Sequence, residues 1–191
     1  MNGYRYHRTP GENRGSTLVE LVILLLLISI LVVQLLPRVL DLSEEAEMAK
    51  LKQIEVSYHQ AVGWVQLTWK LQQHPTRVQN LQGFGSNDVD TNNIGFPIGT
   101  DKGNGNENVG RGRAGCVLLW RGLMLGAPSV STSNDGSEFH AYRHTNNKVC
   151  SYVYRANGDS RNRNRAEYVI KYDSRDGTVV LCGSSPTLPA C

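Results

Sequence analysis

Apolar residues are concentrated in one segment near the start of the chain. Residues 18–36 are almost entirely Leu, Ile and Val, and their polar interruptions are Glu20, Ser29 and Gln34. As an α-helix this segment would measure about 28 Å, which is close to the thickness of the hydrocarbon core of a bilayer. A helix that is apolar on every side is typical of a membrane span. The pattern therefore predicts one membrane-spanning helix.

The residues on either side of the apolar segment favour a membrane anchor over a cleaved secretory signal. The sequence that follows the segment, Pro-Arg-Val-Leu-Asp at residues 37–41, lacks the small residues of a signal-peptidase site. Basic residues precede the span and acidic residues follow it: Arg5, Arg8 and Arg14, then Asp41, Glu44, Glu45 and Glu47. By the positive-inside rule, we expect a cytoplasmic N-terminus and an exported C-terminal part.

Helical periodicity continues beyond the span. Apolar residues recur at intervals of three and four as far as Trp69, with polar residues between them. His74-Pro75 is a typical helix end, so we expect an amphipathic helix over residues 41–75. Its apolar face should lie on a sheet, with Trp64 and Trp69 helping to cover that sheet.

The second half of the chain has the patterns of loops and short strands. Residues 83–115 are rich in Gly, Asn and Asp and predict a long loop, and residues 116–125 form a short apolar segment that favours a helix. Alternating apolar and polar residues then predict an antiparallel meander at about 148–182, with strands at 148–155, 166–172 and 178–182. The predicted fold class is α+β, with a globular head at residues 76–191.

Composition narrows the class further. The chain has 191 residues, 40% of them hydrophobic and 19% charged, which excludes wholesale disorder and allows one domain with an appendage. Its mean hydropathy of −0.34 excludes a polytopic membrane protein. The net charge of +3 owes much to the arginines that precede the span, where they act as an orientation signal.

The four cysteines all follow the span, on the side expected to be exported. An even number there favours disulfides over a redox or metal role. Cys150 begins the first strand of the predicted meander and Cys182 ends the third, so a bridge between these two is disfavoured. We prefer Cys182–Cys191 together with Cys116–Cys150, although four cysteines allow three pairings and the connectivity stays open at this point.

The junction between the basic leader and the apolar helix, Arg-Gly-Ser-Thr-Leu-Val-Glu-Leu at residues 14–21, resembles the processing signal of the type IV pilin family. In that family a prepilin peptidase cleaves after a glycine and the new N-terminus is methylated, which corresponds here to Gly15 and Ser16. Glu20 then matches the family's glutamate at the fifth mature position, and Pro37 its helix-bending proline. Ser16 departs from the phenylalanine that is usual in the family.

The resemblance implies the type IV pilin fold, in which a long N-terminal helix packs on a small antiparallel sheet. Residues 1–15 would be a leader that is removed, residues 16–40 the transmembrane and filament-core helix, and residues 182–191 a disulfide-tied C-terminal loop. The subunit would reside in the inner membrane and then pass through an assembly platform into a surface filament of pilin subunits. There, the Glu20 carboxylate would pair with the Ser16 amine of a neighbour, which sets the register of assembly.

Three further segments are Gly-Phe-Pro-Ile-Gly-Thr at residues 95–100, Cys-Val-Leu-Leu-Trp at 116–120 and Cys-Ser-Tyr-Val-Tyr-Arg at 150–155. Their layout, over roughly residues 94–182, resembles minor pilins of the mannose-sensitive haemagglutinin type, which implies a role in adhesion or filament initiation. The alternatives are a type II secretion pseudopilin, a DNA-uptake minor pilin, and a membrane-anchored periplasmic binding, sensor or enzyme domain.

Motifs of catalysis are absent from the sequence, which has no nucleophile elbow, P-loop, zinc-spaced cluster or dinucleotide fingerprint. We therefore expect neither enzymatic activity nor a cofactor. His140 and His144, with Glu138 nearby, have the look of a metal site, but their polar surroundings favour surface histidines in a loop.

Two groups of charged residues are weak candidates for binding. Acidic residues in the long loop invite a calcium site, but their spacing fits no EF-hand and favours turns: Asp88, Asp90, Asp101 and Glu107. Three arginines alternate with asparagines in a polar loop and could contact DNA: Arg161, Arg163 and Arg165. We expect that loop to be a solvated tip and do not expect nucleic acid as a partner.

Overall fold

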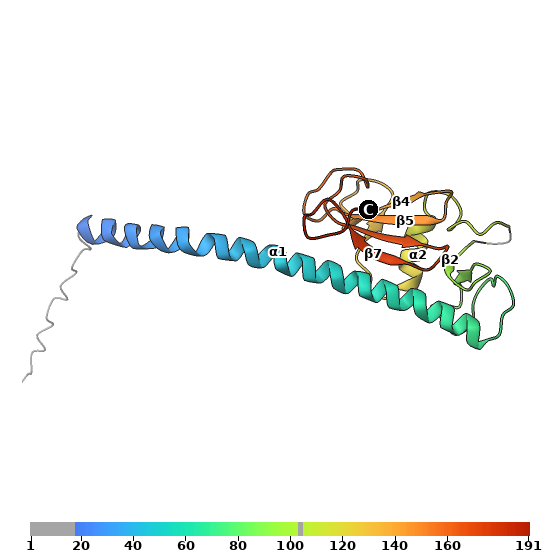
Figure 1. Ribbon diagram of the computed structural model, residues 1–191. Helices are drawn as coiled ribbons and strands as arrows, with labels where there is room; N and C mark the ends of the chain where they lie inside the picture. Colours follow the sequence, from blue (N-terminus) through green and yellow to red (C-terminus); the bar gives the residue numbers. More distant parts are fainter. Residues whose placement is uncertain (1–17, 103–104) are drawn as a thin grey trace, which may run out of the picture. The chain divides into compact units, whose positions relative to one another are not determined.

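The computed structural model describes residues 18–102 and 105–191, with the side chains of residues 36–43 excepted. The chain divides into two compact units, Met1–Glu47 and Met48–Cys191, and helix α1 (Leu18–Leu71) contributes to both (Figure 1). The predicted leader at residues 1–15 lies outside the described residues.

In the first unit, α1 carries the apolar segment found in the sequence. Residues 18–35 form a stretch that is long and apolar enough to cross a membrane, and none of it is buried within the structure. The hydroxyl of Ser29 donates to the carbonyl oxygens of Leu25 and Leu26, at 2.8 and 3.0 Å, so this polar side chain is satisfied inside the helix itself. A helix that meets its own hydrogen-bonding needs is suited to an apolar solvent.

In the second unit, the remainder of α1 forms one wall of the core. Its buried residues follow the predicted spacing of three and four: Leu51, Ile54, Tyr58, Val62 and Val65. Trp69 is half-buried and donates from its indole nitrogen to the carbonyl of Thr76. Trp64 does not cover the sheet as expected, since 60% of its surface is exposed. It follows buried Val62 by two positions, which turns it away from the buried face.

The main sheet of the described residues has five strands in the order β3-β4-β5-β6-β7. β3 pairs with β4 in parallel, and the other neighbours are antiparallel. Figure 1 shows several of these strands beside the C-terminal part of α1. The strands are β3 (Val130–Ser131), β4 (Phe139–His144), β5 (Val149–Tyr154), β6 (Val169–Asp173) and β7 (Val179–Cys182).

The predicted meander corresponds to β5, β6 and β7, but β4 was expected to be a loop. Phe139 and Ala141 alternate with polar residues and are buried, whereas His140 and Tyr142 lie on the opposite face. β4 pairs with β5 along its whole length, from Phe139 opposite Tyr154 to His144 opposite Val149. The strand was missed because this segment is polar overall, and the period-two pattern of Phe139 and Ala141 is short.

The Gly- and Asn-rich stretch at residues 83–115 is also more regular than a plain loop. It contains β1 (Asp90–Thr91) and β2 (Pro97–Gly99), which pair as a small antiparallel sheet with an irregularity between Asp90 and Thr91. Helix α2 (Gly115–Leu123) follows and matches the short apolar segment expected to be helical. The α+β class predicted from the sequence is therefore confirmed.

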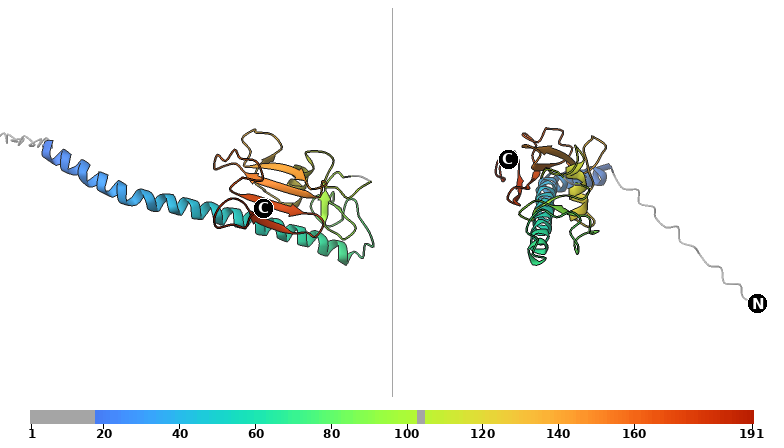
Figure 2. Two further views of the ribbon diagram at one scale, coloured as in Figure 1. Left: turned by 45° about the horizontal axis from the view of Figure 1, so that its top comes forward. Right: turned by 90° about the vertical axis from the view of Figure 1, so that its right-hand side faces the viewer.

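Aromatic side chains fill the core between α1, α2 and the sheet. The ring of Tyr58 on α1 lies 5.2 Å from Trp120 on α2 and 5.7 Å from both Tyr152 on β5 and Tyr172 on β6. Figure 2 shows α2 next to α1 on this side of the sheet. Burial of such rings is the main favourable contribution to the fold of this unit.

Two disulfides close the unit. Cys116 of α2 is bonded to Cys150 of β5, and Cys182 at the end of β7 is bonded to Cys191. This is the pairing that we preferred from the sequence. Cys150 lies opposite Tyr172 and Cys182 opposite Val169, so the two cysteines are at different ends of the strands, as the meander requires.

Candidate functional site

The candidate assembly site lies at the beginning of α1. Glu20 is an acidic residue in the first turn of the described helix, where the helix dipole favours a negative charge. Its neighbours Leu18, Val19 and Leu21 are all more than half exposed, so the carboxylate stands in an apolar and unburied helical surface. Gly15 and Ser16, the predicted processing residues, lie outside the described residues.

Pro37 lies within α1, whose helical backbone continues on both sides of it. Proline has no N–H group, so it cannot donate the helical hydrogen bond to the carbonyl of Val33. The helix therefore has one backbone bond fewer just beyond the segment that is able to cross a membrane.

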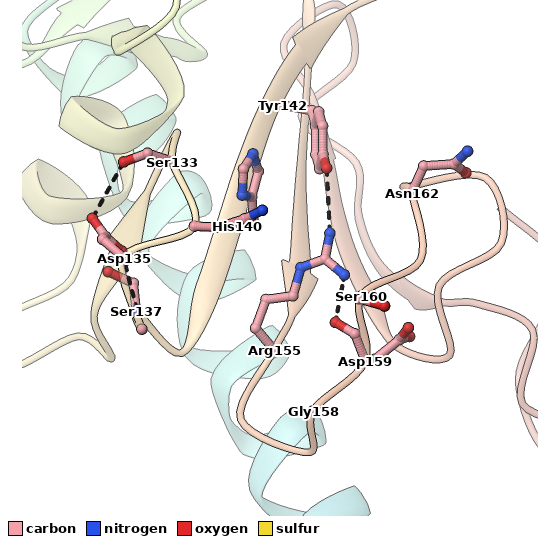
Figure 3. A pocket seen from close by; sticks show the side chains of 12 residues that line it. Ser133, Asp135, Ser137, His140, Tyr142, Arg155, Gly158, Asp159, Ser160 and Asn162 are labelled. Atoms are coloured by element: carbon pink, nitrogen blue, oxygen red, sulfur yellow. Dashed lines mark hydrogen bonds between the residues drawn. The ribbon is translucent and has the colours of Figure 1, made fainter.

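A pocket of about 390 Å³, lined mostly by polar residues, lies in the head beside strand β4 (Figure 3). The loop at residues 133–137 forms one wall and the segment at residues 158–162 forms another. The side chains of His140 and Tyr142, from β4, and of Arg155, just after β5, lie between these walls.

A network around Asp135 holds the first wall of this pocket. The Asp135 carboxylate accepts from the backbone N–H of Ser137 and from the hydroxyl of Ser133, and the Ser131 and Ser133 hydroxyl oxygens are 3.0 Å apart. Hydrogen bonds from Ser131 and Ser137 hold the pKa of Asp135 well below its ordinary value. The carboxylate is therefore ionised at neutral pH.

Asp159 organises the second wall. Its side chain is 3% exposed, it lies 2.8 Å from the Arg161 guanidinium, and it accepts from the backbone N–H of Glu167. Burial raises the pKa of Asp159, but the bonds from Arg161 and the backbone N–H groups outweigh burial and lower it to about 2. Arg161 also contacts the Glu167 carboxylate at 3.2 Å. Its charge is thus balanced by neighbouring acids.

Arg155 and His140 provide polar groups that the fold does not use fully. Arg155 donates to the hydroxyl of Tyr142 and to the backbone carbonyl of Asp159. Its Nε atom and the Nδ1 atom of His140 are covered from solvent and have no hydrogen-bond partner among the described residues. The His140 ring stacks on Tyr142 with centroids 4.5 Å apart. Burial and the charge of Arg155 lower the pKa of His140, so its imidazole is neutral near pH 7.

His144 belongs to a different place on β4. Its Nε2 lies 2.7 Å from the Ser151 hydroxyl and its Nδ1 lies 2.9 Å from the Thr145 hydroxyl. Burial, then the charges of Arg163 and Lys171, lower the pKa of His144 to about 4. A neutral histidine beside a serine is the arrangement of a base with a nucleophile. Ser151 is only 3% exposed, however, so a substrate cannot reach it in this conformation.

The structure separates the histidines and the acid that could have formed a metal site. His140 and His144 are four residues apart on a strand, which corresponds to about 13 Å. Glu138 pairs instead with Lys50 of α1 at 3.2 Å. Sequence reasoning placed these residues in a loop, where such a separation would not have been imposed.

The acidic residues considered for calcium do not converge. Both carboxylate oxygens of Asp90 accept backbone N–H groups, from Asn80 and Lys102, and Glu107 accepts from Asn93. Within residues 18–102 and 105–191, no three His, Cys, Asp or Glu side chains lie where they could jointly hold a metal ion. The carboxylates of Asp90 and Glu107 stabilise the loops of this region by accepting backbone N–H groups.

The three arginines of the polar loop are not equivalent. Arg161 is engaged by Asp159 and Glu167, Arg163 is half-buried, and Arg165 is exposed. The hydroxyl of Ser184 donates to the backbone carbonyl of Arg165, which ties this loop to the C-terminal segment. The loop is mostly exposed to solvent, as expected of a solvated tip, and it is also tied to the rest of the head through these contacts.

Sequence reasoning missed the pocket, including Asp135, Tyr142, Arg155 and Asp159. The turn sequences Ser-Asn-Asp-Gly-Ser at residues 133–137 and Asn-Gly-Asp-Ser at residues 157–160 are visible in the sequence as turns. Nothing local indicates that the two turns lie side by side, because their proximity follows from the pairing of β4 with β5.

Comparison of the chain with protein-family models, with curated proteins and with solved structures finds no match.

Proposed function

We propose that this chain is a subunit of a type IV pilin-like surface filament that serves attachment, most similar to a minor pilin. The observation that carries the proposal is helix α1, whose first part is apolar and unburied whereas its last part forms one wall of a disulfide-closed α+β head. A helix of this kind can be held in a membrane and then exchange lipid for the helices of neighbouring subunits. In such a filament, the head would be the part of the subunit exposed outside the cell.

Glu20 provides the charge that would pair neighbouring subunits in the proposed filament. A carboxylate at the centre of a membrane-spanning helix costs roughly 2.5–3.5 kcal/mol, and less near the interface, so such residues usually have a functional reason. Cleavage after Gly15 would create a free amine at Ser16. In a filament, the Glu20 carboxylate would pair with that amine on a neighbouring subunit, and a wrongly registered subunit would lose the pair in a low dielectric.

The mature N-terminus tests the processing step. Intact-mass and peptide mass spectrometry of the chain from its native host should show a molecule that begins at Ser16. A chain that still begins at Met1 would have no amine at the required position, and the assembly argument would fall.

Substitutions of Glu20 test the assembly step. Glu20→Ala and Glu20→Gln should each reduce surface filaments strongly, with membrane levels of the subunit unchanged. Glu45→Gln is a matched control, because Glu45 is an exposed acid on the same helix beyond the apolar segment. Filaments should be counted by electron microscopy and sheared fractions by immunoblot. Normal filament numbers with Glu20→Gln would rule out the pairing role.

The type II secretion pseudopilin is the second candidate. Pseudopilins commonly lack a C-terminal disulfide, and the Cys182–Cys191 bond therefore favours a pilin. DNA uptake has less support, because Asp159 and Glu167 balance the charge of Arg161.

A further inference from the structure

We propose that the pocket between the 133–137 loop and the 158–162 segment binds an uncharged, polyhydroxylated ligand, that is, a saccharide. The pocket measures about 390 Å³ and is lined by the side chains drawn in Figure 3. This volume lies within the range of small-molecule sites, about 300–1,000 Å³, and accommodates one or two sugar rings.

The charges of the pocket favour neither an anion nor a cation. Arg155 contributes one positive charge, and the ionised Asp135 on the opposite wall contributes one negative charge. Asp159 is balanced by Arg161 at 2.8 Å, and His140 is neutral. An anionic ligand would meet Asp135 and a cationic one would meet Arg155, so a neutral molecule fits best.

The hydrogen-bonding groups of the pocket match hydroxyl groups. Exposed donors and acceptors surround the opening: Ser133, Asn134, Ser160 and Asn162. A hydroxyl both donates and accepts, so it can serve a wall that mixes carboxylate, amide, hydroxyl and guanidinium groups. Sugars carry several such groups on a rigid ring, which limits the entropy lost on binding.

The unused nitrogens of Arg155 and His140 strengthen this reading. A buried polar atom without a partner costs about 1–3 kcal/mol, and a ligand that satisfies it recovers part of that cost. Both atoms are covered in the present conformation, so ligand contact requires a rotation of these side chains. The stacked rings of His140 and Tyr142 add an apolar surface on which the C–H face of a sugar can pack.

A saccharide site would supply the recognition step of an adhesive filament, and as a role in adhesion it rests on the proposed function. Binding itself does not, since the pocket lies entirely in the head. Glu20→Ala should therefore remove filaments and leave saccharide affinity unchanged, whereas pocket variants should do the reverse. Failure of either claim can be recognised without the other.

Binding should be measured by titration calorimetry on the full chain, in a detergent without sugar head groups. The probes are methyl glycosides of glucose, galactose, mannose and N-acetylglucosamine, with glucosamine and N-acetylglucosamine 6-phosphate as charged analogues. At least one neutral glycoside should bind with a dissociation constant on the order of 1 mM or below. The two charged analogues should bind more weakly than the methyl glycoside of N-acetylglucosamine.

Two pocket variants and one control identify the site. His140→Ala and Asp135→Asn should each weaken binding of the neutral glycoside by roughly tenfold. Asp135→Asn should also improve binding of the phosphorylated analogue, since it removes the opposing charge. Asp176→Asn is the control, because Asp176 is an exposed acid whose Oδ1 likewise accepts the backbone N–H two residues on, from Thr178.

Three results would overturn the proposal. One is the absence of binding to every neutral glycoside in the panel. Another is tighter binding of a charged analogue than of its neutral parent. The third is neutral binding that His140→Ala and Asp135→Asn leave unchanged, while thermal melting shows that both variants are folded.

Discussion

The hydroxyl groups of Tyr58 and Tyr152 meet in the centre of the core, with their oxygens 3.1 Å apart. Tyr152 donates its one proton to the backbone carbonyl of Cys116, at 2.9 Å. The Tyr58 hydroxyl must therefore be the donor to Tyr152. Two phenols thus link α1 to β5 and β5 to α2, beside the Cys116–Cys150 disulfide. Burial raises the pKa of both phenols, which keeps them protonated.

This order of donors predicts unequal effects of removing the two hydroxyls. Tyr152→Phe leaves the Tyr58 hydroxyl without its acceptor in a fully buried place and should lower the free energy of unfolding by about 1–3 kcal/mol. Tyr58→Phe removes only a donor and should cost about 1 kcal/mol or less. Urea unfolding followed by tryptophan fluorescence measures both, since Trp120 lies 4.4 Å from the Tyr152 ring. Equal costs would contradict this order of donors.

The two disulfides should differ in their resistance to reduction. Cys116 and Cys150 are fully buried, whereas Cys191 is exposed at the end of the chain. Mild reductant on the native protein should therefore open Cys182–Cys191 first and leave Cys116–Cys150 intact until the head unfolds. Alkylation followed by peptide mass spectrometry gives the order, and simultaneous labelling of all four thiols would contradict it.

Replacing each cysteine pair by alanine should lower the free energy of unfolding, and more so for Cys116–Cys150 than for Cys182–Cys191. The bonds span sequence separations of 34 and 9 residues. The loss of chain entropy on cross-linking predicts costs of about 4 kcal/mol for Cys116–Cys150 and about 2.5–3 kcal/mol for Cys182–Cys191. The same urea titration compares the two double variants with the wild-type chain. A larger cost for the Cys182–Cys191 pair would show that chain entropy does not set the ranking.

Gly177 turns the chain between β6 and β7 under the ring of Phe96. Its φ of +75° is unfavourable for any residue with a side chain, and a Cβ atom there would overlap the Phe96 ring. Gly177→Ala should therefore destabilise the head by about 2–4 kcal/mol, from backbone strain together with displacement of Phe96.

Gly158→Ala isolates the backbone part of that effect. Gly158 has a φ of +81°, but no heavy atom outside its own neighbours lies within 4 Å of its Cβ position. It should cost about 1–2 kcal/mol. Equal melting temperatures for the two variants would mean that the Phe96 ring moves aside freely.

His144 predicts a loss of stability in mild acid. Its pKa falls from 6.5 to about 4 on folding, so between these values the unfolded chain binds more protons than the folded one. Stability is complete above about pH 6.5 and declines as the pH falls towards 4. His140, whose pKa is also lowered, acts in the same direction. The slope per histidine cannot exceed about 1.4 kcal/mol per pH unit, because each histidine binds at most one proton.

Chemical unfolding at a series of pH values checks this behaviour. His144→Gln should flatten the decline between pH 6.5 and 4, whereas His59→Gln, at an exposed position of α1, should not. The pKa of Asp159 falls from 3.8 to about 2 on folding, so its own contribution declines only below about pH 5, and the slope between pH 6.5 and 5 belongs to the histidines. An unchanged slope in His144→Gln would assign the decline to another group.

Much of the head was predictable because its elements have short periods. Leu51, Tyr58 and Val65 repeat at helical spacing, so the buried face of α1 follows from the sequence. The positions of the meander strands also follow, but β5 is buried at all of its residues, which its alternating pattern does not predict. The placement of Cys150 and Cys182 at opposite ends of the meander strands followed from the number of strands between them. Errors arose where the pattern was short, as for β4, and where a large apolar residue lies off the buried face of its helix, as for Trp64.

By itself, the sequence determined an apolar helix with one acid, an amphipathic continuation of that helix, an α+β head and a restricted set of disulfide pairings. These properties depend on residues close together in the chain, whose spacing alone decides which side of an element is apolar. The tertiary structure decided the pocket of Asp135, His140 and Arg155 and the donor order of Tyr58 and Tyr152. Those arrangements join residues far apart in sequence, and only strand pairing and core packing bring their polar atoms within bonding distance.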